Sequence, residues 1–337
     1  MQKILVTGGS GFIGANFIPY FLEKNANISI VNLDLLTYAG DESNLKEVIN
    51  NPRYTFVKGD ICDRDLVEKL FKEHHFTGVI HFAAESHVDN SIKNPDAFVR
   101  TNVFGTFNLL DVAKNYWMKS PNVYKEGFEN CRFHHISTDE VFGTLGATGL
   151  FTENTAYAPN SPYSASKASS DFMVRSYFHT YGFNVVTTNC SNNYGPKQHD
   201  EKLIPTIIRK ALLGENIPIY GDGQNIRDWL FVKDHCSGIE MVYKNGKLGE
   251  TYNIGGKNER NNLYIANTIC TILDEISPKE KLYREQISFV EDRAGHDFRY
   301  AIDASKIEKE LGWKAIENFE TGIKKTIQWY IEKYNKR

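Results

Sequence analysis

The chain has 337 residues, of which 41% are hydrophobic and 24% charged, a composition typical of a globular protein with one large α/β unit or two lobes. Its formal net charge of -3 gives no electrostatic argument for nucleic acid as a partner. No stretch approaches the ~20 apolar residues of a membrane-spanning helix, so we expect no membrane insertion.

The start of the chain and its cysteines bear on where the protein works. Residues 4–6 already form an apolar run, so we expect no signal peptide. The cysteines are scattered and lack a CxxC pair, which favours free thiols over disulfides or a metal site. We therefore expect a reduced, cytoplasmic protein without a bound metal. The cysteines are Cys62, Cys131, Cys190, Cys236 and Cys270.

Residues 4–6 predict a short buried strand, because the run is apolar and partly β-branched. It leads into a glycine-rich turn, GGSGFIG at residues 8–14, and then a helix to about Glu23. Glycines let the backbone approach a pyrophosphate, and the helix N-terminus offers free N–H groups to it. A second strand, residues 28–33, ends at Asp34, whose carboxylate suits the adenosine ribose and repels a 2′-phosphate. This pattern predicts a dinucleotide site that favours NAD over NADP.

Strands and helices continue to alternate through the first half of the chain. Small side chains at Ala83 and Ala84, directly after one predicted strand, leave room for a cofactor at the carboxyl end of the sheet. The alternation predicts an α/β fold with a mostly parallel, doubly wound, Rossmann-like sheet and right-handed crossovers. The predicted strands are residues 54–57, 78–82, 133–136 and 184–188, and the predicted helices are residues 63–74, 96–116 and 164–181.

The alternation loosens after residue 189, where the amide-rich stretch of residues 189–196 is interpreted as a polar turn. We expect residues 1–189 to form the dinucleotide-binding domain, which also carries the catalytic residues. Residues 190–337 are expected to form a smaller α/β carboxyl-terminal lobe that binds substrate, with some chain crossing between the lobes. Its predicted helices are residues 203–213, 263–273, 321–334 and one beginning near 234, and its predicted strands are residues 217–220 and 251–254.

A tyrosine and a lysine, Tyr163 and Lys167, stand four residues apart on one face of a predicted helix. The unperturbed pKa of tyrosine is about 10, so the phenol acts as a base at neutral pH only beside a positive charge. Lys167 and a nicotinamide ring could both supply that charge. Such a pair is common by chance, but behind a Rossmann-like half it predicts the oxidation of an alcohol.

Two adjacent carboxylates, Asp139 and Glu140, follow Thr138 at the end of a predicted strand. Oxidation of an alcohol needs only a hydroxyl at this place, and a carboxylate here could also cap a turn. Elimination of water, in contrast, needs a base that removes a proton from carbon and an acid that protonates the departing hydroxyl. The two carboxylates beside a Tyr/Lys pair therefore favour a dehydration.

Together these motifs make the chain resemble the extended short-chain dehydrogenase/reductase superfamily and, within it, the dTDP-glucose 4,6-dehydratase family over essentially the whole length. The glycine turn and the Tyr/Lys pair are common to the superfamily, whereas the triplet of Thr138, Asp139 and Glu140 is specific to the dehydratases. The stretches that carry the resemblance are residues 8–14, 36–40, 83–89, 137–143, 163–167, 189–196, 227–229 and 292–296.

The resemblance implies a hydro-lyase with tightly bound NAD+ that is regenerated in each turnover. NAD+ would take hydride from C4 of glucose while Tyr163 removes the hydroxyl proton and Thr138 hydrogen-bonds that hydroxyl. Glu140 would then remove the C5 proton, Asp139 would protonate the leaving C6 hydroxyl, and hydride would return to C6. The product would be dTDP-4-dehydro-6-deoxy-glucose, a branch point that leads to rhamnose for cell-surface polysaccharide or to amino-deoxy sugars.

The resemblance also assigns site residues. The catalytic residues it implies are Thr138, Asp139, Glu140, Tyr163 and Lys167. The cofactor contacts it implies are Gly8, Gly11, Phe12, Ile13, Gly14, Asp34, Leu35, Leu36, Thr37, Asp60, Ile61, Phe82, Ala83, Ala84, Ser86, Thr101, Tyr163, Lys167 and Asn193. The substrate contacts it implies are Ser86, Thr138, Asn192, Lys202, Leu203, Pro218, Ile219, Tyr220, Arg227, Asn262, Asp292, Arg293 and His296. Arg227 and Arg293 suit a diphosphate because a guanidinium binds two oxygens at once.

Three positions depart from the family's pattern. Asn90 stands where Arg is usual, Phe142 where Tyr is usual and Ala294 where Pro is usual. The loop of residues 145–151 is also shorter than in many relatives. None of these changes removes a catalytic group, but the loop and Ala294 leave the preference for base and sugar open. The resemblance further implies a homodimer built on a four-helix bundle from residues 96–116 and 164–181.

Other functions stay open at this point. A dehydratase that acts on UDP- or CDP-glucose would carry the same catalytic groups. A 4-epimerase would have small residues in place of Asp139 and Glu140. A non-catalytic NAD-binding regulator would have lost at least one of Tyr163, Lys167 and the two carboxylates, and all four are present.

Overall fold

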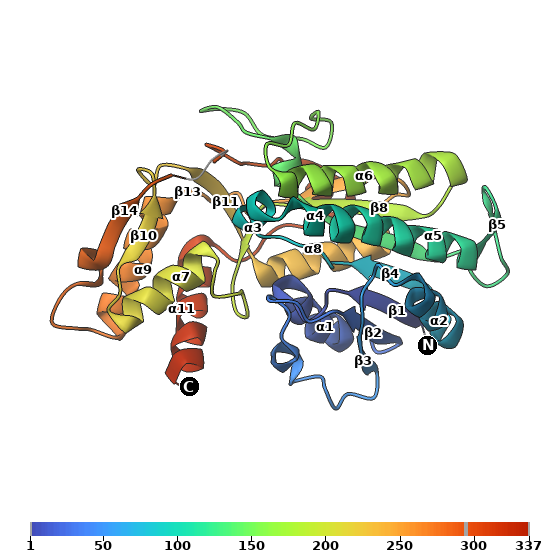
Figure 1. Cartoon of the computed structure of the whole chain (residues 1–337), viewed down its shortest axis with the longest axis horizontal. Helices are drawn as coiled ribbons and strands as arrows, with labels where there is room; N and C mark the ends of the chain where they lie inside the picture. The colour runs from blue at the N-terminus through green and yellow to red at the C-terminus, as the bar shows by residue number, and fades with distance from the viewer. Residues whose placement is uncertain (1, 293–295, 336–337) are drawn as a thin grey trace.

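Parallel strands form the central sheet of the molecule in the order β12-β8-β7-β4-β1-β2-β3, within residues 2–292 and 296–335, which this computed structural model describes. The strand order reverses direction beside β1, as in doubly wound folds (Figure 1). The predicted α/β fold with a Rossmann-like parallel sheet is thus confirmed. The strands are β1 (Gln2–Thr7), β2 (Ile28–Asp34), β3 (Tyr54–Lys58), β4 (Gly78–His81), β7 (Arg132–Thr138), β8 (Val185–Cys190) and β12 (Thr251–Ile254).

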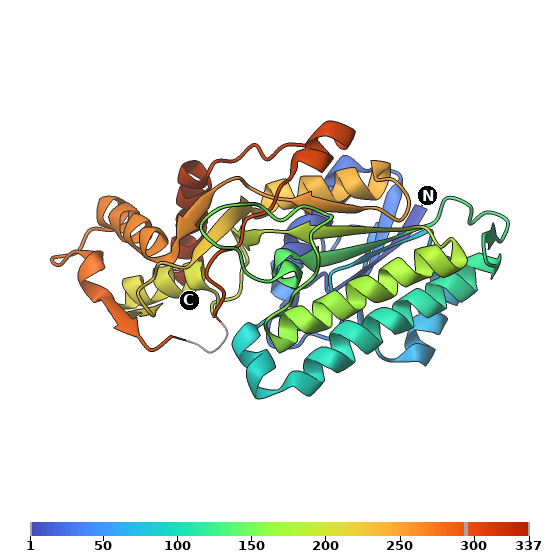
Figure 2. The ribbon, with the colours of Figure 1, turned by 90° about the horizontal axis from the view of Figure 1, so that it is seen from above.

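Successive side chains of each strand point to opposite faces of the sheet and build two separate cores. On β1, Ile4 and Val6 belong to one core and Leu5 to the other. Helices α1, α8 and α10 cover the first face, and α2, α5 and α6 cover the second, where α5 and α6 run side by side (Figure 2). The helices are α1 (Phe12–Lys24), α2 (Arg64–His74), α5 (Thr106–Trp117), α6 (Pro162–Tyr181), α8 (Val232–Asn245) and α10 (Ser305–Leu311).

A smaller lobe lies beyond the carboxyl ends of these strands, in yellow to red at the left of Figure 1. Its sheets, β13-β11-β9 and β10-β14, pack with three helices around a third core. On β11, Trp229 and Phe231 point into this core, whereas Leu230 points into the first core and so joins the two halves. The elements are β9 (Asn192–Tyr194), β10 (Ile217–Tyr220), β11 (Ile226–Phe231), β13 (Glu259–Asn261), β14 (Ile287–Val290), α7 (Leu203–Leu213), α9 (Asn262–Ile276) and α11 (Phe319–Asn335).

The chain returns from the lobe to the central sheet within residues 232–254. Helix α8 packs on α1, and β12 adds to the sheet edge by pairing Thr251 with Thr187 and Ile254 with Cys190. These residues therefore lie with the first half in space although they follow the lobe in sequence. The predicted boundary between the two domains after residue 189 therefore stays a prediction.

Two of the predicted segments take a different form in the structure. The predicted helix of residues 96–116 is interrupted by a π-helical segment, in which Asn102 donates to the Glu85 carbonyl oxygen (3.0 Å) and to Ser166 Oγ (2.8 Å). The amide-rich stretch of residues 189–196 is not only a turn, because β9 pairs there with β11. The remaining elements are η1 (Glu42–Leu45), α3 (Val88–Lys93), α4 (Pro95–Phe98), η2 (Val99–Gly105), β5 (Met118–Ser120), β6 (Val123–Tyr124), η3 (Asp139–Phe142) and η4 (Tyr283–Gln286).

Candidate active site

The glycine turn between β1 and α1 forms a tight cradle. Gly8 has a φ of +70°, and a Cβ there would lie 2.5 Å from the backbone nitrogen of Ala83. A Cβ on Gly14 would lie 2.6 Å from the carbonyl oxygen of Gly8. Only glycine permits both approaches, and the turn opens onto the N-terminus of α1, whose free N–H groups favour a phosphate. The cradle therefore fits the pyrophosphate of a dinucleotide.

Asp34 ends β2 beside this cradle. Its Oδ2 accepts a hydrogen bond from the Ser10 backbone N–H (2.9 Å), and its Oδ1 accepts one from the Leu36 N–H (2.8 Å). Burial raises the pKa of this carboxyl, while the two backbone N–H groups lower it. A carboxylate held at this place suits a ribose hydroxyl and repels a 2′-phosphate. The residues present thus fit NAD rather than NADP.

The N-terminus of helix α6 is fixed by its capping residues. Ser161 and Ser164 form a capping box, with the Ser164 N–H donating to Ser161 Oγ (3.1 Å) and the Ser161 N–H donating to Ser164 Oγ (3.0 Å). Pro162 occupies the first helical position, where its missing N–H costs nothing, and Gly182 ends the helix with a φ of +65°. This start sets which residues of α6 face the sheet.

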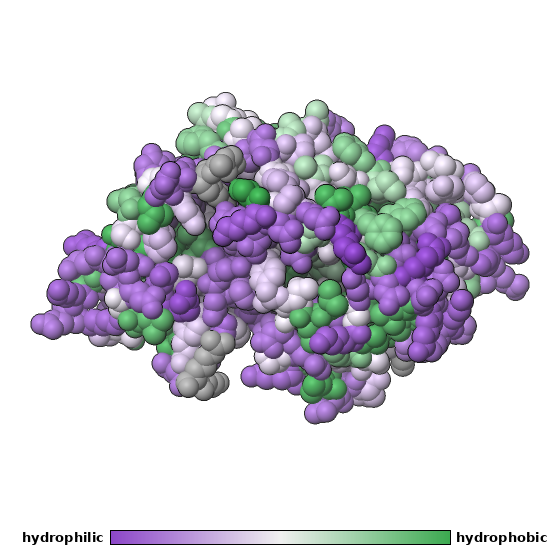
Figure 3. Space-filling model, in the orientation of Figure 1, coloured by the Kyte–Doolittle hydropathy of each residue, from purple (hydrophilic) through white to green (hydrophobic). Residues whose placement is uncertain are grey.

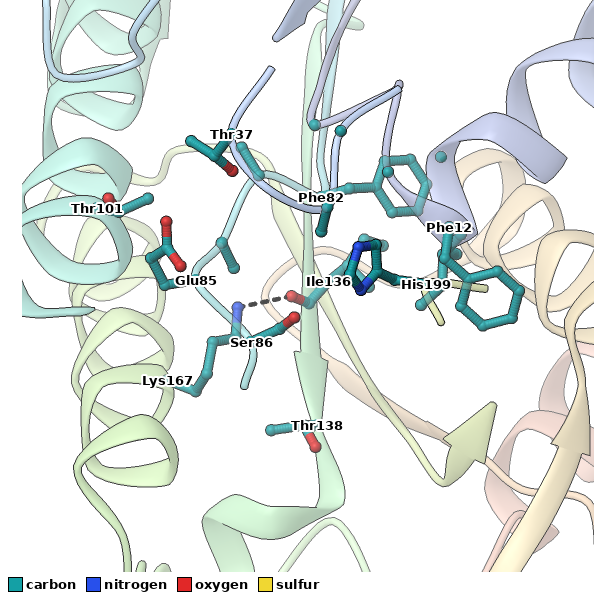
Figure 4. A pocket seen from close by; sticks show the side chains of 18 of the residues that line it. Phe12, Thr37, Phe82, Glu85, Ser86, Thr101, Ile136, Thr138, Lys167 and His199 are labelled. Carbon is teal, nitrogen blue, oxygen red and sulfur yellow. Dashed lines mark hydrogen bonds between the residues drawn. The ribbon is translucent and has the colours of Figure 1, made fainter. Parts of the chain in front are cut away.

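Tyr163 and Lys167 are both buried on the face of α6 that packs against the end of β7. Lys167 Nζ donates to the Ile136 carbonyl oxygen at 2.8 Å (Figure 4). Burial, and then the carboxyl of Glu140, raises the pKa of the Tyr163 phenol well above its usual value, while the Thr138 side chain lowers it. These surroundings therefore favour the protonated phenol, so a nearby positive charge is needed before it can act as a base.

Asp139 and Glu140 begin η3 directly after β7 and differ in their surroundings. The Asp139 side chain is fully buried, whereas Glu140 is half-buried. Burial, and then the charges of Glu140 and Asp228, raise the pKa of the Asp139 carboxyl well above its usual value. This shift favours a protonated acid at Asp139.

A cavity of about 320 Å³ opens between the carboxyl ends of the strands and the lobe, and Figure 3 shows the surface hollowed there. It brings together all five predicted catalytic residues and every predicted cofactor contact except Leu36, whose N–H instead holds Asp34. The predicted substrate contacts that line the same cavity are Ser86, Thr138, Asn192 and Lys202.

Several residues that line this cavity were not assigned as site residues from the sequence. Glu85 follows Ala84 at the end of β4, and His199 and Glu201 come from the loop before α7. The Glu201 carboxylate lies 3.8 Å from both His87 Nε2 and His199 Nδ1. A run of polar residues next to a predicted helix start is the only signal that could have found them. The other unpredicted lining residues are Leu33, Ala39, Gly40, Gly59, Ile136, Ser137, Cys190, Ser191 and Gln198.

A second group of predicted substrate contacts lies in the lobe and does not line the cavity. The Tyr220 ring meets the His296 ring edge-on with 6.5 Å between centroids, and His296 Nδ1 lies 2.6 Å from Asp292 Oδ1. Asn262 begins α9 beside this group, and its N–H donates to the Asn225 carbonyl oxygen (3.2 Å). The remaining members are Leu203 at the start of α7, and Pro218 and Ile219 on β10.

Three of the predicted substrate contacts in the lobe are either buried or lie outside the described residues. The Ile219 side chain is buried in the lobe core, so only its backbone could meet a ligand. The Arg227 guanidinium is buried against the Tyr300 ring (4.3 Å to the centroid), and its Nη2 donates to the Asp297 carbonyl oxygen (2.9 Å). Arg293 lies outside the described residues, as does Ala294.

The described part of the chain contains no group of three or more His, Cys, Asp or Glu side chains arranged for a metal ion. No described helix is long and apolar enough to cross a membrane. The five cysteines are unpaired, and all but Cys62 are buried.

Comparisons with known proteins agree with this geometry. The family model described as GDP-mannose 4,6 dehydratase matches residues 5–326. A curated dTDP-glucose 4,6-dehydratase from Xanthomonas campestris pv. campestris (strain B100) is 55% identical over 333 residues, covering 98% of this chain and 93% of that protein.

Two solved structures are similar over nearly the whole chain. The dTDP-glucose 4,6-dehydratase from Bacillus anthracis strain Ames, in complex with NAD, has a TM-score of 0.87 and 44% identity, covering 99% of this chain and 98% of that one. The dTDP-glucose 4,6-dehydratase from Streptomyces venezuelae, with NAD and TYD bound, has a TM-score of 0.90 and 42% identity, with the same coverage.

Proposed function

The chain belongs to the dTDP-glucose 4,6-dehydratase family, and we propose that it removes water from dTDP-glucose to give dTDP-4-dehydro-6-deoxy-glucose. The observation that carries the proposal is the pair of adjacent carboxyls, Asp139 and Glu140, in one cavity with Tyr163 and Lys167. NAD+ is the cofactor: when bound, it accepts hydride from C4 of the sugar and returns hydride to C6, so the reaction has no net redox change. The enzyme is a hydro-lyase.

In the first step, Tyr163 takes the proton of the C4 hydroxyl, and the Thr138 hydroxyl holds that oxygen in place. Tyr163 and Lys167 both line the cavity, and α6 fixes them one helical turn apart. Lys167 contributes a positive charge near the phenol, which favours its deprotonated form. The resulting keto group at C4 makes the C5 proton acidic.

In the second step, Glu140 takes the C5 proton and Asp139 protonates the departing C6 hydroxyl. The burial of Asp139 supports this division, because a raised pKa keeps a carboxyl protonated until a leaving group needs the proton. Glu140 is half-buried and stands closer to solvent. After hydride returns to C6, C5 is protonated again and the product leaves.

We assign the adenosine end of NAD+ to the cradle around Gly8 and to Asp34, and the nicotinamide end to the wall that holds Tyr163 and Lys167. The nucleotide of the substrate is assigned to the lobe, around Tyr220, Asp292 and His296. This assignment is supported by the ring and carboxylate groups that gather there and by the position of the lobe beyond the carboxyl ends of the central strands (Figure 1).

A homodimer through α5 and α6 is part of the proposal. Large apolar side chains are exposed on these helices and the segment before α5, where Val99 is 57%, Phe104 50% and Phe172 56% accessible. A shallow hollow lined by Val103, Phe107 and their neighbours lies among them, and Figure 3 shows apolar residues over this region. A contiguous apolar patch of this kind supports a second copy of the chain as its partner.

The location and pathway are also proposals. A cytoplasmic enzyme fits five unpaired cysteines, since free thiols are usual where the surroundings are reducing. The keto-sugar product would serve deoxysugar synthesis, with rhamnose for cell-surface polysaccharide as the first pathway to examine.

The test is to incubate the purified protein with dTDP-glucose without an added oxidant and to follow the sugar by mass and by alkaline absorbance. Loss of one water without net NADH supports the dehydratase. A new C4 epimer of unchanged mass would instead indicate an epimerase. Turnover of UDP- or CDP-glucose but not dTDP-glucose would keep the mechanism and change the substrate, and inactivity with all three would contradict an enzymatic role.

Glu140→Gln and Asp139→Asn separate the two carboxyls. We expect Glu140→Gln to stop the reaction after oxidation, with reduced nicotinamide accumulating and no solvent deuterium entering C5. Asp139→Asn should still exchange the C5 proton but eliminate water roughly 10²- to 10⁴-fold more slowly. If the two variants behave alike in deuterium exchange, the assignment of acid and base is wrong.

A further inference from the structure

A buried carboxylate that the proposed reaction does not use, Asp171, lies on α6 one turn beyond Lys167, which itself lies one turn beyond Tyr163. The Asp171 side chain is 4% exposed and does not line the cavity. An ionised carboxylate is costly to bury unless it is paired and hydrogen-bonded. Its partners therefore indicate what it does.

Three donors from two segments, β7 and the loop before α6, converge on Asp171. His135 Nε2 on β7 lies 3.0 Å from Oδ1, Ser137 Oγ donates to Oδ2 at 2.7 Å, and the Tyr157 hydroxyl donates to Oδ2 at 2.9 Å. With His135, Ser137 and Tyr157 all positioned as donors, the arrangement suits an anionic carboxylate. The carboxylate is thus fixed in orientation by side chains that themselves lie outside the cavity or at its edge.

The imidazole beside Asp171 does not neutralise it. His135 is fully buried, and burial, followed by the charge of Lys167, holds its pKa well below the usual range. A neutral His135 donates a hydrogen bond through Nε2 but carries no positive charge. The positive charge that acts on Asp171 is that of Lys167, and in return the charge of Asp171 raises the pKa of Lys167, which burial lowers.

Other titratable groups face this pair from each packed element. They are His81 on β4, His135 on β7, Tyr157 in the loop before α6 and Cys190 on β8. Asp139, Glu140 and Tyr163 interact with one another nearby. Burial keeps His81 and His135 neutral, and it keeps Tyr157, Tyr163 and Cys190 protonated. Asp139 and Glu140 act on the phenol of Tyr163.

We propose that Asp171 is a positioning residue for the reaction: its carboxylate keeps the buried Lys167 ammonium charged, one helical turn from Tyr163 on α6. The inference rests on the proposed function, in which Tyr163 is the base of the first step. Lys167 Nζ is held by the Ile136 carbonyl oxygen, which fixes the position of the ammonium but supplies no full charge. Asp171, four residues further along α6, supplies the full negative charge.

The central variant is Asp171→Asn, which keeps the shape and removes the charge. Lys167 should then lose its proton more readily, so we expect the alkaline limb of the kcat profile to move down by roughly 1 to 3 pH units. At neutral pH kcat should fall by about 10-fold or more, with KM for dTDP-glucose and the NAD content unchanged. A fall in kcat by one constant factor at every pH, or a change in KM alone, would show that Asp171 is only structural.

Tyr157→Phe tests the same idea without removing the carboxylate. It deletes one donor to Asp171 but keeps the ring that packs edge-on against Phe142. A less solvated carboxylate takes up a proton at higher pH, so the acidic limb of kcat should rise by roughly half to one pH unit. An unmoved acidic limb overturns the proposal, even if Asp171→Asn cannot be purified folded.

The matched control is Asp111→Asn on α5. Asp111 also has three partners, Arg64 (2.8 Å), Lys114 (3.0 Å) and Asn115 (3.0 Å), but it lies away from the cavity. Both limbs should stay in place, and a shift like that of Asp171→Asn would overturn a local role. The native chain is assayed beside the variants, because its failure to turn over dTDP-glucose would contradict the proposed function rather than this inference.

Discussion

The catalytic wall of the cavity and the predicted substrate contacts of the lobe hold their polar side chains in different ways. On the wall formed by β7, η3 and α6, Lys167 and Asp171 are buried and bonded to other parts of the chain. On the lobe, Tyr220 is 41% exposed at the end of β10, and the side chain of Asp292 is 45% exposed. The catalytic wall is thus organised before any ligand arrives, whereas the lobe presents groups whose contacts a ligand would complete. The comparison predicts that the catalytic wall controls the rate and the lobe controls affinity.

Tyr163→Phe should give the largest effect. Removing the hydroxyl that accepts the proton should lower kcat by about 10²- to 10⁴-fold, while the NAD content and the thermal unfolding midpoint stay close to native values. Steady-state kinetics, cofactor extraction and thermal unfolding measure these three quantities. Tyr181→Phe at the far end of the same helix is the control and should retain native kcat. A similar loss in both variants would mean that the helix, not the phenol, is being tested.

The second effect concerns stability on the same wall. Burial raises the pKa of Asp171 to about 6, so the folded chain holds this proton more tightly than the unfolded chain does. The resulting stability is fully present below the ordinary pKa of 3.8 and is lost as the pH rises through about 6.

The unfolding free energy of the native chain relative to Asp171→Asn should therefore fall by roughly 2–3 kcal/mol between about pH 4 and pH 7. Urea unfolding at a series of pH values measures this difference. Asp111→Asn, measured in parallel, should show no such fall over the same range. A difference that grows with pH would contradict the assigned direction of the shift.

On the lobe, Tyr220→Ala should weaken substrate binding without slowing the chemistry. We expect KM for dTDP-glucose to rise about 10-fold, equivalent to about 1.4 kcal/mol, with kcat within a factor of two of native. Tyr264→Ala is a matched control, because Tyr264 is 42% exposed in the same lobe but lies against Arg260 and Phe319. If Tyr220→Ala lowers kcat as strongly as Tyr163→Phe, the division of labour between the catalytic wall and the lobe is wrong.

The smallest effect should come from Ser161→Ala at the start of α6. Losing this cap should cost about 1 kcal/mol of unfolding free energy. Because the cap sets the first turn, which carries Tyr163, a modest fall in kcat should accompany it. Thermal unfolding and steady-state kinetics on one preparation measure the loss of stability and the fall in kcat together. Ser176→Ala, near the other end of the helix, should change neither by as much.

The sequence predicted the central sheet well because its information is local. Buried parallel strands appear as short apolar runs, and GGSGFIG marks the one turn where Gly8 and Gly14 leave no room for a Cβ. The cavity residues at the strand ends followed from the same pattern. The roles given to individual residues stay predictions, since they depend on bound ligands.

Other features depended on pairings between distant parts of the chain. The strand at Asn192–Tyr194 forms only because Trp229–Phe231 lies beside it, and residues 227–232 carried no strand prediction either. The π-helical segment at Val99–Gly105 interrupts what reads as one regular helix. Asp171 reads in the sequence as an ordinary polar residue of a helix, because its partners come from β7 and from the loop before α6.

The edge position of β12 has a consequence for how the protein is made. β8 pairs with β7 on one side and with β12 on the other, but β12 is synthesised only after the segment that builds β9, β10 and β11. Until residue 254 has left the ribosome, residues 187–190 of β8 lack the backbone partner that β12 provides. Unpaired strand edges attract other chains, so a nascent or prematurely ended copy that stops within the lobe would be prone to aggregate. About three quarters of the chain must therefore be synthesised before the central sheet is complete.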